Sequence, residues 1–239
     1  MIVYYAGVGR EITALFTAVT NGCRHLMLSY YCKISDKQMR RFRKLGIHIF
    51  LDSGGFSAWK SNVEINIDEY IQHIKNNYIG KYINLDVVNN PEKSYENLKY
   101  MESNGLQPIP VFHLGSDLKY LQQLVDEEYY YICLGGTVGK SRKERIKFFD
   151  ECFSKFPNTY FHGLGMTDPK LMNKYPWFSV DSTTWLSGRK YCKVMTDEGL
   201  RQLPKDMPIQ ERLALNVQYF SELEEKLKDK QQNINIIKS

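Results

Sequence analysis

Three aspartates and two histidines stand at the ends of short apolar runs, where the strands of a parallel sheet would end. Asp52, Asp86 and Asp181 each follow such a run, and His113 and His162 lie at the ends of two others. Because the carboxyl ends of parallel strands meet on one face of a barrel, we expect these side chains to converge. Paired carboxylates suit glycosidic chemistry, in which one attacks an anomeric carbon and the other moves protons. This convergence favours an enzyme over a purely structural protein.

Asp52 is followed by the segment Ser53-Gly54-Gly55-Phe56. A carboxylate at the edge of an apolar barrel is partly desolvated, which raises its pKa toward the value of a general base. The two glycines would let a flat ligand approach the backbone, and Phe56 would offer a stacking face. The structural alternative is that Gly54 and Gly55 only form a tight turn and that Asp52 caps a helix.

The remaining candidates also have structural alternatives. Asp86 and Asp181 could each cap a helix, and a lone histidine such as His113 is more often structural than catalytic. His162 is followed by Gly163-Leu164-Gly165, which would leave room for a ligand plane. No pair of histidines has a metal-ligating spacing, so the sequence predicts no metal site.

The segment Leu134–Ser141 looks like a phosphate-binding loop, because glycines follow a predicted strand and a helix begins soon after. The P-loop motif requires a glycine where this chain has Leu134, so a dedicated NTPase is not indicated. The backbone amides of Gly135 and Gly136 would still be able to donate to a carbonyl or phosphate oxygen.

Strand-like and helix-like segments alternate along the whole chain, which predicts an α/β protein with a parallel sheet. Eight such units in 239 residues favour a single compact (β/α)8 TIM-type barrel over residues 1–230, with a polar, frayed tail over residues 231–239. The expected strands are Ile2–Ala6, Leu26–Ser29, Ile47–Leu51, Tyr82–Val87, Ile109–His113, Tyr130–Leu134, Thr159–Gly163 and Trp177–Asp181. The expected helices are Glu11–Asn21, Asp36–Leu45, Ile67–Asn77, Pro91–Asn104, Leu118–Glu127, Ser141–Phe156, Pro169–Asn173 and Ile209–Lys228.

The composition is that of a soluble globular protein. The formal net charge is +5, and the 43% hydrophobic residues suffice for a full core. No apolar run is long enough to span a membrane, and no signal peptide is apparent, so we expect a cytoplasmic protein. The five scattered cysteines support neither a disulfide framework nor a zinc knuckle. Basic residues cluster at 40–44 and 140–147, which indicates solvated helix faces or contacts with phosphates.

Several of these segments, taken in order, resemble the tRNA-guanine transglycosylase superfamily. They are Leu51-Asp52-Ser53-Gly54-Gly55-Phe56, Leu85-Asp86, Leu134-Gly135-Gly136, Phe161-His162-Gly163-Leu164-Gly165 and Val180-Asp181-Ser182. The opening Val3-Tyr4-Tyr5-Ala6-Gly7 is similar to the phage and bacterial branch that inserts 7-deazaguanines into DNA.

That resemblance implies a role for each residue at the predicted site. Asp181 would be the nucleophile that forms a covalent glycosyl-aspartate, and Asp52 would be the general acid and base. The substrate-binding residues would be Asp86, Phe56, Gly135, Gly136, His113, His162, Ser53, Gly54 and Gly55. The expected function is exchange of guanine in DNA for a free 7-deazaguanine base, without a cofactor.

The chain departs from the tRNA enzymes near its C-terminus. After Asp181 it contains only Cys192 and no histidine, so the zinc-binding lobe that helps grip tRNA is missing. This favours DNA as the partner, with Lys140, Arg142, Lys143 and Arg189 as nucleic-acid contacts and a helper ATPase as a conceivable second partner. The alternatives are a DNA glycosylase, a tRNA-guanine transglycosylase and a non-catalytic module that binds nucleic acid or a base. The oligomeric state stays open.

Overall fold

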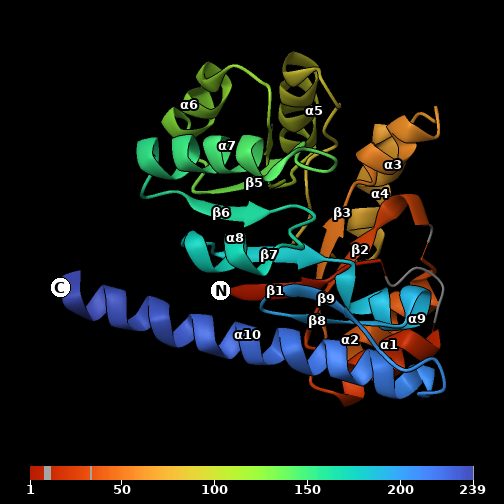
Figure 1. The fold of residues 1–239 in the computed structure, drawn as a ribbon. Helices are drawn as coiled ribbons and strands as arrows, with labels where there is room; N and C mark the ends of the chain where they lie inside the picture. Colours follow the sequence, from red (N-terminus) through yellow and green to blue (C-terminus); the bar gives the residue numbers. More distant parts are fainter. Residues whose placement is uncertain (8–11, 33, 239) are drawn as a thin grey trace.

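The computed structural model describes residues 1–7, 12–32 and 34–238 of the chain, and it has an α/β fold with a curled parallel sheet (Figure 1). Seven strands follow one another in the order β3-β2-β1-β7-β6-β5-β4, and every neighbouring pair is parallel. Their bounds are β1 Ile2–Tyr5, β2 His25–Ser29, β3 His48–Asp52, β4 Val111–His113, β5 Tyr131–Gly135, β6 Tyr160–Gly163 and β7 Ser179–Ser182. The predicted barrel-type fold is therefore confirmed.

A short extended segment joins the two ends of this sheet. Leu51 of β3 forms a parallel bridge with Tyr82, and Ile83 forms one with Ile109, just before β4. The strand expected over Tyr82–Val87 is thus only two residues long. It ends early because the chain turns toward the next helix, where the Asn97 side chain donates to the Leu85 carbonyl at 2.8 Å.

Helices follow most strands and cover the outside of the sheet (Figure 1). The main ones are α1 Ile12–Thr20, α2 Asp36–Lys44, α4 Ile67–Asn76, α5 Pro91–Ser103, α6 Leu118–Asp126, α7 Arg142–Lys155, α8 Pro169–Lys174 and α10 Ile209–Lys238. Each begins close to a helix expected from the sequence, although Glu11, the expected first residue of the first helix, lies outside the described residues, as does Ser239. The helix α10 continues to Lys238, past its expected end at Lys228 and into the segment expected to be a frayed tail. Ser35 and Ser141 begin α2 and α7 with capping boxes, which explains why these boundaries were predictable.

The structure also contains elements that periodicity did not indicate. They are the 3-10 turns η1 Tyr30–Cys32 and η2 Thr184–Leu186, the short helices α3 Gly55–Lys60 and α9 Ser187–Tyr191, and an antiparallel hairpin of β8 Lys193–Thr196 and β9 Gly199–Gln202. These elements are too short for a periodic pattern to develop. The α3 helix and η2 follow β3 and β7 directly, so they border the carboxyl end of the sheet.

The long helix α10 runs along one side of the barrel, beside β1 and α1 (Figure 1). Its backbone accepts a hydrogen bond at Val217 from the Tyr5 hydroxyl at 3.0 Å. The Glu224 side chain accepts one from the Val3 amide at 3.1 Å. Because both contacts bind β1, α10 holds the first strand in place. None of the described helices is both long and apolar enough to cross a membrane.

The interior of the barrel is packed rather than hollow. Its inward-facing side chains include Tyr4, Met27, Phe50, Ile83 and Cys133, all buried. These residues come from five different strand segments and fill the lumen below the carboxyl ends of the strands. A filled lumen leaves two surfaces of the barrel for binding, one at each end of the strands.

Candidate functional site

The three aspartates converge at the carboxyl end of the barrel, as expected. Asp52 ends β3, Asp181 lies in β7, and Asp86 follows the two-residue segment that closes the ring. Burial raises the pKa of the Asp52 carboxyl to about 7, and the charges of Asp86 and Asp181 add to that rise. A backbone hydrogen bond from Gly54 opposes it. Asp52 is therefore suited to gain and lose a proton near neutral pH.

Asp86 is held by groups on two neighbouring loops. Its Oδ2 atom lies 3.0 Å from Nε2 of His113, and its Oδ1 atom accepts from the Ser53 hydroxyl at 3.1 Å. The Ser53 hydroxyl accepts in turn from the Gly55 amide at 3.1 Å. The contact with Asp86 orients the His113 ring.

Asp181 is fixed through one of its two oxygens. Oδ1 accepts from the Gly165 amide at 2.7 Å and lies 3.4 Å from Nε2 of His162. These contacts from the described residues both use Oδ1. No hydrogen bond or ion pair to Oδ2 is recorded among the described residues.

A chain of polar side chains continues from Asp181 into the barrel. Nδ1 of His162 lies 2.6 Å from the Ser179 hydroxyl, which lies 2.6 Å from the Tyr131 hydroxyl. Burial lowers the pKa of His162, so its ring is neutral, and burial raises the pKa of Tyr131, so its hydroxyl keeps its proton. One assignment satisfies the two hydrogen bonds: Tyr131 donates to Ser179, and Ser179 donates to Nδ1 of His162. The Nε2 atom of His162 then lies 3.4 Å from Oδ1 of Asp181 without a hydrogen-bond partner among the described residues.

Sequence reasoning did not identify Ser179 or Tyr131. The available signal was the two-residue period of a strand, because Ser179 lies on the same face of β7 as Asp181. Extending each candidate backward along its own strand would have identified Ser179. The contact between Ser179 and Tyr131 was beyond reach, since β5 and β7 are separated by β6 in the sheet.

The glycines beside the aspartates are required by close packing. A Cβ atom on Gly54, whose φ is +80°, would lie 2.5 Å from Cβ of Tyr31. On Gly55 it would lie 2.8 Å from the Asp86 carbonyl oxygen, and on Gly135 it would lie 2.8 Å from Cδ2 of His113. Gly136 has a φ of +72°, which a side chain rarely adopts. Close packing and backbone conformation therefore explain why these positions are glycine, without any ligand.

The two rings expected at the ligand site, Phe56 and His162, lie in different surroundings. Phe56 is 47% exposed on α3, and its ring is tilted against Trp59 with centroids 6.0 Å apart. His162 is completely buried and meets the edges of Tyr4 and Phe50. His162 is therefore part of the barrel interior, and its contacts explain why it is polar yet buried.

The basic residues proposed for nucleic-acid contact lie on or near helices. Arg142 binds Asp168 through Nε at 2.8 Å and Nη2 at 2.7 Å, so its charge is largely offset. Lys140, Lys143 and Arg189 are exposed. A role for these residues with a polyanion stays a prediction.

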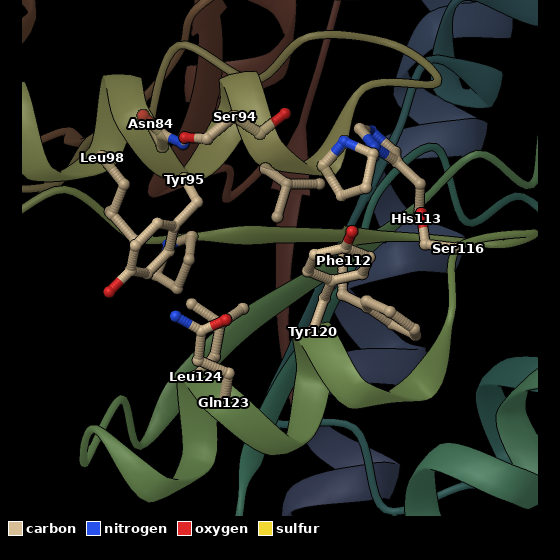
Figure 2. Close-up of a pocket in the computed structure, with 13 residues that line it drawn as sticks. Asn84, Ser94, Tyr95, Leu98, Phe112, His113, Ser116, Tyr120, Gln123 and Leu124 are labelled. Carbon is tan, nitrogen blue, oxygen red and sulfur yellow. The ribbon is translucent and has the colours of Figure 1, made fainter.

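A small pocket lies beside His113, between α5 and α6 (Figure 2). Tyr95 and Ser94 of α5 face Tyr120 and Gln123 of α6 across it. Its volume of about 30 Å³ has room for a molecule of the size of water. This pocket is too small for an organic substrate. The barrel mouth, which is the carboxyl end of the barrel where Asp52, Asp86 and Asp181 converge, is the better candidate site. Within residues 1–7, 12–32 and 34–238, no group of three or more ligating side chains is arranged to hold a metal ion.

Comparison with protein-family models finds no match, and comparison with curated proteins finds none either. Solved structures do match. The 4-hydroxy-2-oxoglutarate/2-deydro-3-deoxyphosphogluconate aldolase from TTHB1 has a TM-score of 0.58 at 9% identity, covering 93% of each chain. The tryptophan synthase alpha chain from Legionella pneumophila has a TM-score of 0.58 at 12% identity, covering 94% of this chain and 91% of that one. This chain shares their fold. At such identities the likeness extends to the fold alone.

The resemblance to the tRNA-guanine transglycosylase superfamily is therefore wrong. The matching structures include aldolases and tryptophan synthase alpha chains, which are barrels of a different family. The expected exchange of guanine for a 7-deazaguanine in DNA depended on that resemblance, so this prediction is also wrong. The glycosylase and tRNA alternatives depended on it too and are wrong for the same reason. The physical reason lies in the motif itself, since Gly54 and Gly55 are dictated by contacts with Tyr31 and Asp86.

Proposed function

We propose that the chain is an enzyme that performs general acid–base catalysis on a small polar substrate at the carboxyl end of the barrel. The observation that carries this proposal is the pKa of Asp52, raised to about 7 at the point where Asp86 and Asp181 converge. A carboxyl group with such a pKa gives and takes protons at neutral pH. Strongly perturbed pKa values of this kind cluster at functional sites.

Asp52 and Asp181 have different surroundings and hence different roles. Asp52 is desolvated and exchanges the proton. Asp181 receives the Gly165 amide and faces the neutral His162 ring, contacts that favour a fixed carboxylate. Asp181 therefore binds and orients a donor group of the substrate through Oδ2. Two carboxyl groups held in different surroundings can take different parts in one reaction.

The charge of the mouth selects the substrate. Three carboxyl groups converge there, and the adjacent His162 is neutral because burial lowers its pKa. Such a rim repels anions and accepts hydrogen bonds from hydroxyl and amino groups. The substrate is thus an uncharged or cationic molecule rich in hydroxyl or amino groups.

The reaction is bond cleavage or isomerisation that begins with proton transfer, as in a lyase or an isomerase. Aldolases occur among the solved structures of this fold, so the scaffold is compatible with such chemistry. Lys81, a lysine inside the barrel, lies at the amino end of the strands. Proton transfer by carboxyl groups fits the mouth better than covalent chemistry by a lysine.

The test combines a titration with a turnover assay. Carbon-13 NMR of the aspartate carboxyl groups is expected to show one midpoint about pH 7, absent from the Asp52→Asn variant. Neutral and cationic polyols, amino alcohols and hydroxy carbonyl compounds are then incubated in D2O, and NMR follows deuterium incorporation and product formation. Asp52→Asn is expected to lower turnover about 10²- to 10⁴-fold.

The matched control is Asp126→Asn, the same change at an exposed carboxyl at the end of α6. It is expected to retain the turnover of the wild type. A midpoint near pH 4 for Asp52 would overturn the proposal, as would equal turnover by the Asp52→Asn variant. Turnover restricted to anionic compounds would contradict the assigned substrate class.

A further inference from the structure

A second cavity opens at the amino end of the barrel, opposite the aspartates. Its volume is about 510 Å³, within the range of small-molecule pockets. It lies where β1, β2 and β3 begin, and its lining includes Tyr4, His25, Arg43, His48, Ile79 and Lys81. None of the residues that line it is acidic.

Lys81 is the central charge of this cavity. Its Nζ atom lies 4.5 Å from the ring centroid of Tyr131 and 5.2 Å from that of Phe50, and it donates to the Tyr4 hydroxyl at 3.1 Å. Burial lowers the pKa of this ammonium group. Among the described residues, no carboxylate forms an ion pair with it within 4 Å. The rings stabilise the ammonium only in part, so a bound anion would complete its environment.

The acid beside His25, Glu224, is already engaged. Oε2 of Glu224 accepts from the Val3 amide at 3.1 Å, and Oε1 lies 3.3 Å from Nζ of Lys228. Oε1 also lies 3.9 Å from Nδ1 of His25. Glu224 therefore binds the backbone of β1 and the ammonium group of Lys228. The charged residues that line the cavity, Arg43 and Lys81, are both basic.

Two imidazole rings also line the cavity. The rings of His25 and His48 are stacked, with centroids 5.2 Å apart and an angle of 21° between their planes. Burial lowers the pKa of His25 to about 4, helped by the neighbouring charges of His48, Lys228 and Lys81, so this ring is neutral at pH 7. Isoleucines of the lining add apolar surface.

We propose that this cavity binds an aromatic phosphate monoester, with the phosphate between Lys81 and Arg43 and the flat ring against His25 and His48. Arg43 is exposed at the end of α2, and Nη2 donates to the Asn77 carbonyl, which holds the guanidinium at the rim. Arg43 lines the cavity, and guanidinium groups bind phosphate in a forked geometry through their N–H donors. The ligand is thus opposite in charge to the substrate assigned to the other end, so the two sites do not compete.

The probe is 1-naphthyl phosphate, whose binding is followed by fluorescence anisotropy with the full chain. Inorganic phosphate carries the charge without the ring, and 1-naphthol carries the ring without the charge. Naphthyl phosphate is expected to bind at least about 10-fold more tightly than either, since it uses both the basic groups and the imidazole rings. It is also expected to shift the backbone amide signals of Gly80 and Lys81 in an NMR spectrum.

Two variants locate the site. Arg43→Gln is expected to weaken binding about 10-fold, because it removes one charged contact with the phosphate. The matched control is Arg40→Gln, the same change at an exposed position of the same helix, which is expected to bind as the wild type does. Lys81→Gln is expected to abolish binding, with circular dichroism to verify the fold.

Equal binding by Arg43→Gln and Arg40→Gln would overturn the proposal. So would 1-naphthol binding as tightly as its phosphate, because the cavity would then be only an apolar hollow. Absence of binding by the wild type would also overturn it. None of these results bears on Asp52, so this proposal stands or falls independently of the catalytic one.

Discussion

Nε2 of His162 lies 3.4 Å from Oδ1 of Asp181, and the histidine side chain is completely buried. This contact joins the rim of the barrel to its interior. The position of the Asp181 carboxylate at the rim therefore depends on buried groups of the barrel interior. The polar chain through Ser179 to Tyr131 is the structural basis of that dependence.

Asp52 makes the stability of the fold depend on pH. Its pKa is raised from 3.8 to about 7, so between these values the unfolded chain releases a proton that the folded chain retains. Stability is therefore expected to fall as the pH rises from 4 to 7. Asp52→Asn is expected to stabilise the fold by about 1–2 kcal/mol at pH 8 and to have little effect at pH 4. Urea unfolding at both pH values measures this, and an equal effect at both would contradict it.

Ser179→Ala is expected to destabilise the fold by about 1–3 kcal/mol, since it removes the partner of both the His162 ring and the Tyr131 hydroxyl in a buried site. Tyr131→Phe is expected to cost about 1 kcal/mol. The double variant should lose less than the sum, because the two residues share one hydrogen bond. Urea unfolding gives the three values, with Tyr130→Phe, at an exposed ring, as the control. Strict additivity would show that no coupling exists.

Gly55→Ala is expected to destabilise the fold by about 1–3 kcal/mol, although alanine favours helices. The added Cβ would lie 2.8 Å from the Asp86 carbonyl oxygen, which cannot move without displacing Asp86. Gly80→Ala is the matched control, because nothing lies within 4 Å of its added Cβ. Thermal unfolding compares the two variants. Equal melting temperatures would mean that the loop after β3 is not tightly packed.

Asp168→Ala is expected to destabilise the fold by about 1–3 kcal/mol. Its carboxylate caps α8 at the Lys170 amide and pairs with Arg142 at 2.7 Å and Arg145 at 3.5 Å. Arg142→Gln should cost less than 1 kcal/mol, because Arg145 and the Lys170 amide still hold Asp168. Urea unfolding of both variants tests this order, and the reverse order would assign Arg142 the larger structural role.

The family resemblance shows how a short motif can mislead. The segment Asp52-Ser53-Gly54-Gly55 has its glycines because a side chain would collide with Tyr31 or Asp86. A barrel that packs a loop this closely needs glycine whatever its reaction. The motif thus reflects local geometry, whereas the solved structures that match over 93% and 94% of the chain share its fold and are enzymes without that reaction in their names.

The sequence by itself determined the alternation of strands and helices and the place of the aspartates at strand ends. Both follow from local periodicity and capping, which depend on residues close together in the chain. Only the tertiary structure decided how the barrel closes through Tyr82 and Ile83. It alone paired Asp86 with His113 and Ser179 with Tyr131, and it alone formed the cationic cavity at the amino end. Those contacts join residues far apart in the sequence, and side-chain packing, which no local pattern records, sets their geometry.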